Sequence, residues 1–123
     1  MDKIGTPSKN WKKEKFEENK IAFLQLISTY QEEHEKIKLG GGIIAIEKQH
    51  NKKRLTARER IDHIIDPATS FFEIGIYAAW QMYEEYGSPP ASGTIAGIGI
   101  VEGYDCMIVA NDATVKAGAY FEV

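Results

Sequence analysis

The chain has 123 residues, 43% of them apolar and 27% charged, and it carries a net charge of −3. This length allows one domain at most, and no apolar run approaches the ~20 residues that a membrane-spanning helix needs. The N-terminus has neither the apolar core of a signal peptide nor the bias of a transit peptide. One cysteine, Cys106, excludes a disulfide framework and a cysteine metal cluster, so a reducing cytoplasm is the default compartment.

Charge is distributed unevenly along the chain. Residues 1–53 hold 11 Lys or Arg and 8 Asp or Glu, whereas residues 54–123 hold 4 and 10. After Arg60 the only Lys or Arg is Lys116. Because affinity for nucleic acid comes from many neutralised phosphates, the acidic half makes a poor nucleic-acid surface. We expect neither a nucleic acid nor a membrane among the partners.

The first predicted element is a long helix. Residues 1–10 contain Gly5 and Pro7 and predict a disordered tail. From residue 11 to about residue 38 apolar side chains recur every seven positions, at Phe16, Phe23, Tyr30 and Ile37. So long a stripe suggests that the helix packs on a body or partner larger than this chain. A solvated helix on its own domain is the alternative.

Three glycines, Gly40, Gly41 and Gly42, end that helix, because glycine accepts the left-handed conformation at a helix end. A second helix follows, with Ile43 and Ile46 predicted to face inward, and ends in the polar run 48–53. Glycines before a helix can also bind phosphate at its N-terminus. The lysine and hydroxyl of a P-loop are missing here, which disfavours that interpretation.

A short third helix begins at a capping box, in which Thr56 caps the helix and Glu59 reaches back to the cap amide. Its predicted apolar face comprises Ile61, Ile64 and Ile65. The helix ends at Asp66-Pro67, because the residue before proline avoids helical angles.

The remaining pattern predicts strands. Residues 71–77 form the first strand, with Phe72, Ile74 and Ile76 sharing one face, and residues 78–93 form a long surface loop. Residues 94–110 form a hairpin of two apolar strands with its turn at residues 102–103. Gly97 and Gly99 within that hairpin indicate close packing of a helix on their face, or else close approach of a ligand.

No complete catalytic constellation is visible. The three histidines, His34, His50 and His63, have no metal-ligand spacing with one another or with Cys106. Polar Asn111 and Asp112 follow an apolar strand, a position that commonly lines a crevice in α/β folds. Lys116 is a lone cation in an acidic segment. From the sequence alone, a salt bridge to a neighbouring carboxylate and contact with an anionic ligand are equally well supported roles for it.

The hairpin also predicts that the chain continues in a larger protein. Apolar strands need a sheet and covering helices to bury them, and only residues 111–123 follow. Whether the end at Val123 is natural or engineered is not evident from the sequence.

Taken together, the segments resemble the N-terminal part of the carboxyltransferase β subunit of biotin-dependent acyl-CoA carboxylases. The match runs over about residues 39–123 in the right order. It is carried by GGG at 40–42, EKQH at 47–50, LTARERI at 55–61, SFFEIG at 70–75 and CMIVANDATVK at 106–116. In sequence, these segments are most similar to the 3-methylcrotonoyl-CoA carboxylase branch of the family, and next to the propionyl-CoA carboxylase branch.

The resemblance implies an α/β fold, α+β in this part of the chain. Residues 11–66 would form a helical N-terminal arm, and residues 67–123 the first strands of a truncated crotonase-like (ClpP/crotonase) domain that binds acyl-CoA. Where the family has paired glycines, this chain has Ala117 and Gly118, a change expected to affect packing more than chemistry. The family's backbone oxyanion holes lie beyond residue 123, so no catalytic residue and no cofactor-binding residue is assigned here.

The resemblance further implies transfer of a carboxyl group from carboxybiotin to an acyl-CoA, with Asp112, Thr114 and Lys116 at the CoA channel. Expected partners are an acyl-CoA, a biotin-carrying α subunit and further β subunits in a homo-oligomer. The chain by itself is expected to be inactive and to bind no cofactor or metal. Two alternatives remain: a non-catalytic module that docks on another subunit, and part of a short crotonase-like hydratase.

Overall fold

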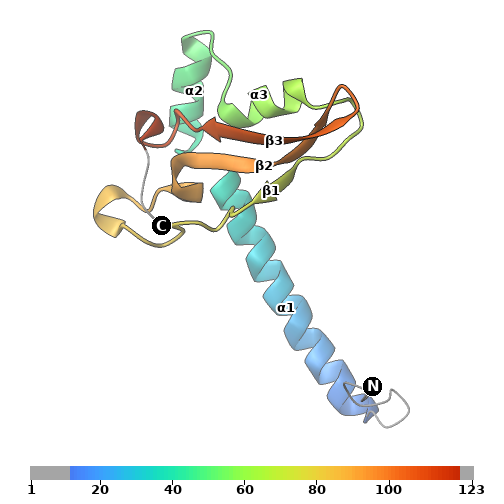
Figure 1. The fold of residues 1–123 in the computed structure, drawn as a ribbon. Coiled ribbons are helices and arrows are strands. Elements are labelled where there is room, and N and C mark those ends of the chain that lie inside the picture. The colour runs from blue at the N-terminus through green and yellow to red at the C-terminus, as the bar shows by residue number, and fades with distance from the viewer. Residues whose placement is uncertain (1–11, 120–123) are drawn as a thin grey trace. The chain divides into compact units, whose positions relative to one another are not determined.

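The computed structural model describes residues 12–119, which form three α-helices and a three-stranded sheet (Figure 1). The predicted tail, residues 1–10, lies outside the described residues. The chain divides into two compact units, residues 1–33 and residues 34–123. No helix within residues 12–119 is both long and apolar enough to cross a membrane.

The long helix α1 runs over Lys13–Lys38, so the prediction of a helix ending near residue 38 is confirmed. The heptad stripe is not buried evenly along it. Phe23 and Tyr30 are 62% and 56% exposed, whereas Ile37 is fully buried. Ile37 lies in the second unit, where it forms an apolar cluster with Ile76 and Ala91.

The second helix, α2, runs over Ile43–Asn51. The prediction that Ile43 faces inward is wrong, since its side chain is 63% exposed. Ile46, the other residue predicted to face inward, is half-buried, and Gln49 contacts the turn that follows residue 111. Ala45 Cβ would lie 3.2 Å from a Cβ added at Gly41, and Gln49 Nε2 donates to the Ala113 carbonyl over 3.4 Å. Ile43 is the first residue of the helix.

The predicted capping box opens α3, Ala57–Ile64, and is confirmed. The Thr56 N–H donates to Glu59 Oε2 over 2.7 Å, and the Glu59 N–H donates to Thr56 Oγ1 over 3.3 Å. His50, on α2, lies 2.9 Å from Glu59 Oε1 through its Nε2 atom. The hydrogen bond from the Thr56 backbone and the one from His50 lower the pKa of Glu59.

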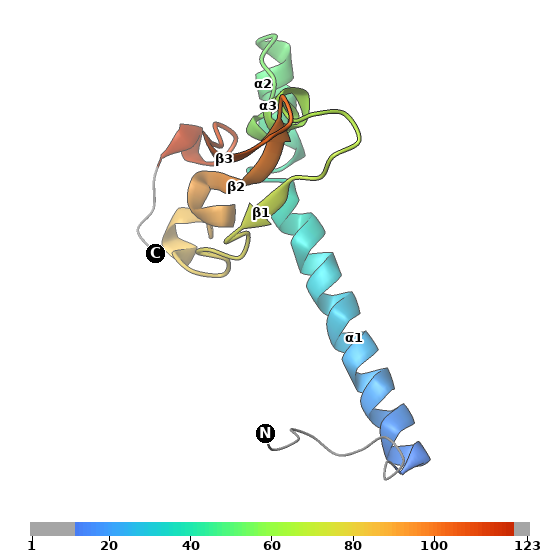
Figure 2. The same ribbon diagram turned by 45° about the vertical axis from the view of Figure 1, so that its right-hand side comes forward.

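The three strands are antiparallel in the order β1-β2-β3, as Figure 2 shows, with β1 at Phe72–Ile74, β2 at Thr94–Val101 and β3 at Tyr104–Asn111. The hairpin prediction is confirmed. Its turn residues, Glu102 and Gly103, have φ angles of 51° and 80°, as a two-residue hairpin turn requires. Asp66, just past α3, accepts both turn N–H groups over 2.8 Å, which fixes the far end of the hairpin.

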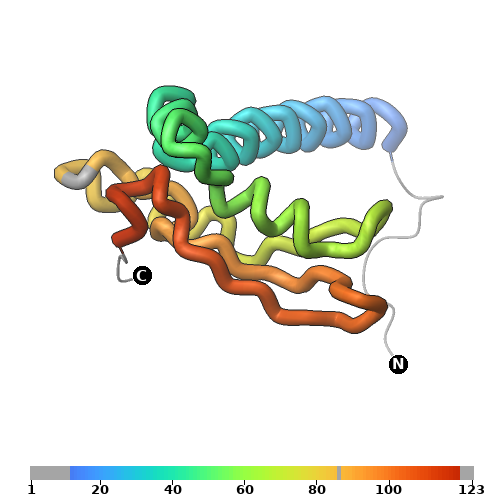
Figure 3. Tube along the Cα trace, turned by 90° about the horizontal axis from the view of Figure 1, so that it is seen from above, coloured from blue at the N-terminus to red at the C-terminus, as the bar shows by residue number. Residues whose placement is uncertain are grey.

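One face of the sheet is covered by α3, which runs alongside the hairpin (Figure 3). Ile61 is 3% exposed and packs with Ile95 and Phe71, but Ile64 is 54% exposed, so the predicted apolar face of α3 was wrong for Ile64. The opposite face of the sheet is exposed. Its large apolar residues, each at least 38% exposed, are Phe72, Ile74, Ile98, Met107 and Val109.

The first strand is shorter than predicted. Phe72 and Ile74 share a face, but the strand ends at Ile74 because Gly75 adopts a φ angle of 71°. Ile76 therefore leaves the sheet and is buried beside Ile37. Arg58 of α3 holds the strand through two hydrogen bonds to the carboxylate of Glu73, at 2.6 and 3.0 Å.

Close packing explains the two strand glycines. A Cβ added at Gly99 would lie 2.7 Å from Ile65 Cγ2, at the end of α3, and one at Gly97 would lie 2.5 Å from the ring of Phe71. The covered face therefore has no room for side chains at these positions, which confirms helix-end packing as the reason for Gly99.

The prediction of a surface loop at residues 78–93 is confirmed for residues 81–85, which are mostly exposed, but is wrong near both ends of the segment. Ala79, Ala91 and Ser92 are at most 7% exposed, and Pro89 is among the most fully buried side chains. The segment contains two short 3₁₀ turns, Glu84–Tyr86 and Pro90–Gly93. It is tied inward by the Ser92 N–H, which donates to the Ala78 carbonyl over 3.0 Å.

Candidate functional site

The predicted site residues Asp112, Thr114 and Lys116 follow β3 directly. β3 ends at Asn111, and the Asp112 N–H donates to the carbonyl of Gly93 over 2.9 Å, which joins the end of β3 to the start of β2. Asp112 and Thr114 are buried, 7% and 9% exposed, whereas Lys116 is exposed. The polar strand end therefore turns inward before the chain returns to the surface.

A short chain of hydrogen bonds starts at Asp112. Its Oδ1 atom accepts the Thr114 N–H over 2.9 Å and the Thr114 hydroxyl over 2.6 Å. Thr114 Oγ1 in turn accepts the Gly41 N–H over 3.0 Å. We call this the Asp112 hydrogen-bond chain. It connects the turn after β3 to the glycine loop between α1 and α2.

The glycine loop can approach this closely only because it has no side chains. A Cβ added at Gly40 would lie 2.5 Å from Asp112 Oδ2 and 2.6 Å from Thr114 Oγ1, and one at Gly41 would overlap the Thr114 carbonyl. Gly40 also has a φ angle of 55°, which glycine adopts most readily. The loop thus ends α1, as predicted, and also packs against the 112–114 turn.

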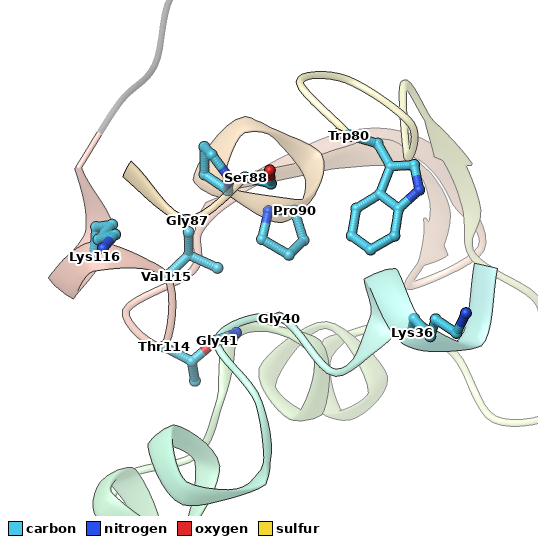
Figure 4. Close-up of a pocket in the computed structure, with 11 residues that line it drawn as sticks. Lys36, Gly40, Gly41, Trp80, Gly87, Ser88, Pro90, Thr114, Val115 and Lys116 are labelled. Carbon is cyan, nitrogen blue, oxygen red and sulfur yellow. The ribbon is translucent and has the colours of Figure 1, made fainter. Parts of the chain in front are cut away.

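A cavity of about 460 Å³ opens beside this turn (Figure 4). We call it the lysine cavity. One wall is formed by the glycine loop together with Thr114 and Val115, and the opposite wall by Trp80 and residues 87–90. Its lining residues are Lys36, Gly40, Gly41, Trp80, Gly87, Ser88, Pro89, Pro90, Thr114, Val115 and Lys116. Asp112 does not line it but lies behind Thr114, through the hydrogen bonds above.

The charges of the lysine cavity are all positive. Lys36 and Lys116 lie at its opposite ends (Figure 4), and none of the described lining residues is Asp or Glu. Between the two lysines the wall is apolar and aromatic at Trp80 and Pro90. Two ammonium groups at the ends of a partly apolar cavity suit a ligand that has anionic groups and a flat or apolar body.

Lys116 itself has two informative features. Within residues 12–119 it makes no ion pair, so a salt bridge to Asp112 is not formed; Glu122, the other partner considered, lies outside the described residues. Its φ angle is 44°, a left-handed conformation that costs about 1–3 kcal/mol in a residue other than glycine. Ten other described residues that are not glycine also have positive φ angles, so the position of Lys116 at the cavity, and not its backbone, points to a binding role.

Six residues of the cavity were not predicted to belong to a binding site: Lys36, Trp80, Gly87, Ser88, Pro89 and Pro90. Lys36 lies in the last turn of α1. Trp80 and Ser88 belong to the segment assigned to a surface loop. The clustering of Trp80 with Gly87, Pro89 and Pro90 in one loop was the available signal, because long ordered loops often form binding sites.

The histidines considered as candidate ligands do not form a second site in the part of the chain that the structure describes. Within residues 12–119, no group of three His, Cys, Asp or Glu side chains could hold a metal ion. His34 lies against Tyr77, with ring centroids 6.3 Å apart, and His50 is engaged with Glu59. Neither histidine lines the lysine cavity.

Residues 48–123 match the model of the carboxyl transferase domain. The chain belongs to this family. Its relatives include the mitochondrial methylcrotonoyl-CoA carboxylase β chains of Arabidopsis thaliana, 39% identical over 89% of this chain, and of Dictyostelium discoideum, 41% identical over 97%. The carboxyltransferase subunit of Haloferax mediterranei propionyl-CoA carboxylase is 35% identical over 79%. The chain spans about a fifth of the length of these curated relatives, 18–20%.

Solved structures of the family have the same arrangement. The β subunit of Pseudomonas aeruginosa geranyl-CoA carboxylase matches 94% of this chain, and 21% of its own, with a TM-score of 0.73 and 26% identity. Transcarboxylase 12S, a hexamer crystallised with methylmalonyl-CoA, matches 76% of this chain, and 18% of its own, with a TM-score of 0.69 and 30% identity. The predicted fold class, helices followed by the first strands of a crotonase-like carboxyltransferase domain, is confirmed. The boundary predicted at residues 66–67 stays a prediction.

Proposed function

We propose that the protein carrying this sequence is the carboxyltransferase component of a biotin-dependent acyl-CoA carboxylase, and that its substrate is 3-methylcrotonoyl-CoA. The observation that carries the proposal is the match of residues 48–123 to the carboxyl transferase domain. Identities of 39% and 41% to two methylcrotonoyl-CoA carboxylase β chains, over nearly the whole chain, support this acyl group.

The reaction moves a carboxyl group from N-carboxybiotin to a carbon adjacent to, or vinylogous with, the thioester carbonyl. The carbanion that forms needs its enolate oxygen stabilised by fixed donors, commonly backbone N–H groups. We assign no nucleophile or base for this step to the described residues, so their part would be binding. Carboxybiotin enters as a co-substrate carried by another polypeptide.

The lysine cavity supports a binding role, since CoA carries phosphates and a flat adenine. Lys36 and Lys116 would meet phosphates, and the wall at Trp80 would accept a flat or apolar group. Thr114 lines the cavity, and Asp112 accepts a hydrogen bond from the Thr114 hydroxyl without lining the cavity itself. The assignment of Asp112, Thr114 and Lys116 to CoA binding is therefore part of this proposal.

The partners follow from the same proposal. The hexameric assembly of transcarboxylase 12S supports a homo-oligomer of carboxyltransferase subunits. A biotin-carrying α subunit would deliver the carboxyl group. We place the protein in the cytoplasm, although the two methylcrotonoyl-CoA relatives are named as mitochondrial.

An acyl-CoA panel tests the proposed function. The protein carrying this sequence, expressed with its biotin-bearing partner, should fix carboxylate on 3-methylcrotonoyl-CoA with a kcat/KM at least about tenfold above that for propionyl-CoA, since recognition of one acyl chain over another is worth about 1–3 kcal/mol. The isolated 123-residue chain should have no turnover.

Two other results would change the assignment. Preference for propionyl-CoA would favour the propionyl-CoA carboxylase alternative, which the Haloferax relative supports. No turnover with any acyl-CoA, but stable binding to a biotin-carrying subunit, would favour the non-catalytic docking module.

A further inference from the structure

The Asp112 hydrogen-bond chain crosses between two segments that are distant in sequence. Gly41 and Thr114 are 73 positions apart, and their contact is a hydrogen bond from a backbone N–H to a side-chain hydroxyl. The hydroxyl of Thr114 can donate only once, and it donates to Asp112. The Thr114 oxygen can still accept a hydrogen bond, and it accepts one from the Gly41 N–H.

The same groups form a wall of the lysine cavity. Gly40, Gly41 and Thr114 all line it, and Lys116 follows Thr114 by two residues. Asp112 does not line the cavity, yet both of its hydrogen bonds from Thr114 depend on its Oδ1 atom. The turn is closed further by the Val115 N–H, which donates to the Asp112 carbonyl over 3.0 Å.

We propose that Asp112 is a positioning residue, which, by holding Thr114 against the Gly41 N–H, fixes the cavity wall and the strained Lys116 backbone in the geometry that accepts ligand. This proposal rests on the proposed function for the identity of the ligand, an acyl-CoA. It assigns Asp112 no ligand contact of its own. Thr114 is the residue through which Asp112 acts.

Three features argue for positioning over direct contact. Asp112 is 7% exposed, and its Oδ1 already accepts two donors. Its other oxygen, Oδ2, faces Gly40, where even a Cβ would lie 2.5 Å away. An anionic ligand in a cavity with two lysines would also gain nothing from contact with a carboxylate.

The experiment uses the complete protein that carries this sequence. Thr114→Val removes the hydroxyl at nearly constant volume, Thr114→Ser keeps it, and Asp112→Asn keeps the shape but removes the charge. Thr69→Val is the matched control, because the Thr69 hydroxyl also donates within 2.6 Å, to the Asp66 carbonyl, and does not line the cavity.

Two measurements are made on each variant: hydrogen exchange at the Gly41 amide, and KM and kcat for the acyl-CoA. With Thr114→Val we expect Gly41 exchange to become about tenfold faster, because the amide loses its acceptor. KM should rise about 3- to 10-fold with kcat within about twofold, as for a lost binding geometry. Thr114→Ser should restore both, and Thr69→Val should change neither.

The double variant Asp112→Asn with Thr114→Val separates positioning from contact. If Asp112 acts through Thr114, the double variant should have the same KM as Thr114→Val alone. If the two residues contacted the ligand independently, the fold-increases in KM of the two single variants would multiply in the double variant. The proposal would be overturned if the KM increases multiply in the double variant, or if KM rises in Thr114→Val without faster hydrogen exchange at Gly41.

Hydrogen exchange at Gly41 tests the positioning role even if the protein shows no turnover of acyl-CoA. If the protein uses no acyl-CoA, the proposed function fails, but unchanged Gly41 exchange in Thr114→Val would still refute the link. Should Thr114→Val not fold, Asp112→Asn alone carries the test. The neutral amide oxygen of asparagine accepts the Thr114 hydroxyl more weakly than the carboxylate does, so Thr114 should be held less firmly and hydrogen exchange at Gly41 should become about threefold faster. An unchanged exchange rate would overturn the proposal.

Discussion

Replacing Lys116 by alanine should weaken acyl-CoA binding in the protein that carries this sequence. Lys116 is exposed at one end of the lysine cavity and makes no ion pair within residues 12–119. A charge-assisted hydrogen bond is worth about 1–3 kcal/mol, and the exposed position places Lys116 in the lower part of that range. A loss of about 1–2 kcal/mol corresponds to a KM about 5- to 30-fold higher.

The assay is steady-state kinetics with the acyl-CoA varied at saturating carboxybiotin. Because a phosphate remote from the reacting carbon is bound alike in the ground and transition states, kcat should stay within about twofold. The difference between wild type and Lys116→Ala should shrink in 1 M salt, where charges are screened beyond about 3 Å.

Lys53 provides a matched control. It is also an exposed lysine with a left-handed backbone, with a φ angle of 56°, and it does not line the lysine cavity. Lys53→Ala therefore repeats the loss of charge at a strained position without touching the cavity, and should leave KM unchanged. An unchanged KM in Lys116→Ala, or an equal rise in Lys53→Ala, would refute the assignment of Lys116 to phosphate binding.

Four further predictions concern stability and association. Thr56→Ala should lower the free energy of unfolding by about 1 kcal/mol through loss of the cap, seen as a lower denaturant midpoint at constant slope. Since the folded-state pKa of Glu59 is lowered, its stabilising effect should be present above its ordinary pKa of 4.5 and be lost as pH falls through the folded pKa; Glu59→Gln should flatten this part of the pH–stability curve. Gly99→Ala should destabilise the protein by about 1–3 kcal/mol, because the new Cβ would lie 2.7 Å from Ile65. The isolated chain should self-associate in light scattering through the exposed sheet face, and Met107→Lys should reduce this; a concentration-independent monomer would contradict it.

Local elements could be predicted from the sequence because their signals are local. A seven-residue repeat ending at three glycines fixed the end of α1, and a threonine followed three residues later by glutamate fixed the start of α3. Two apolar runs flanking residues 102–103 predicted the hairpin and its turn. Each of these signals acts through backbone geometry within a few residues, whatever the rest of the chain does.

Which side of each element is covered was harder to predict. The sequence placed Ile43 and Ile64 inside, and both are exposed, because a short helix has several apolar positions and only its neighbours determine which of them is buried. The same holds for Phe72 and Ile74, which share a face as predicted, although α3 covers the other face.

The sequence by itself therefore determined the element types, the capping box, the hairpin and, through its motifs, the carboxyltransferase family. Only the tertiary structure determined that Trp80 and residues 87–90 line a cavity with Lys36 and Lys116, and that the Gly41 N–H donates to Thr114 from 73 positions away. Propensity and periodicity report the local backbone, whereas such contacts depend on how distant segments pack together. For that reason Asp112 could be marked as a polar strand end from the sequence, but its hydrogen bonds to Thr114 could not be foreseen.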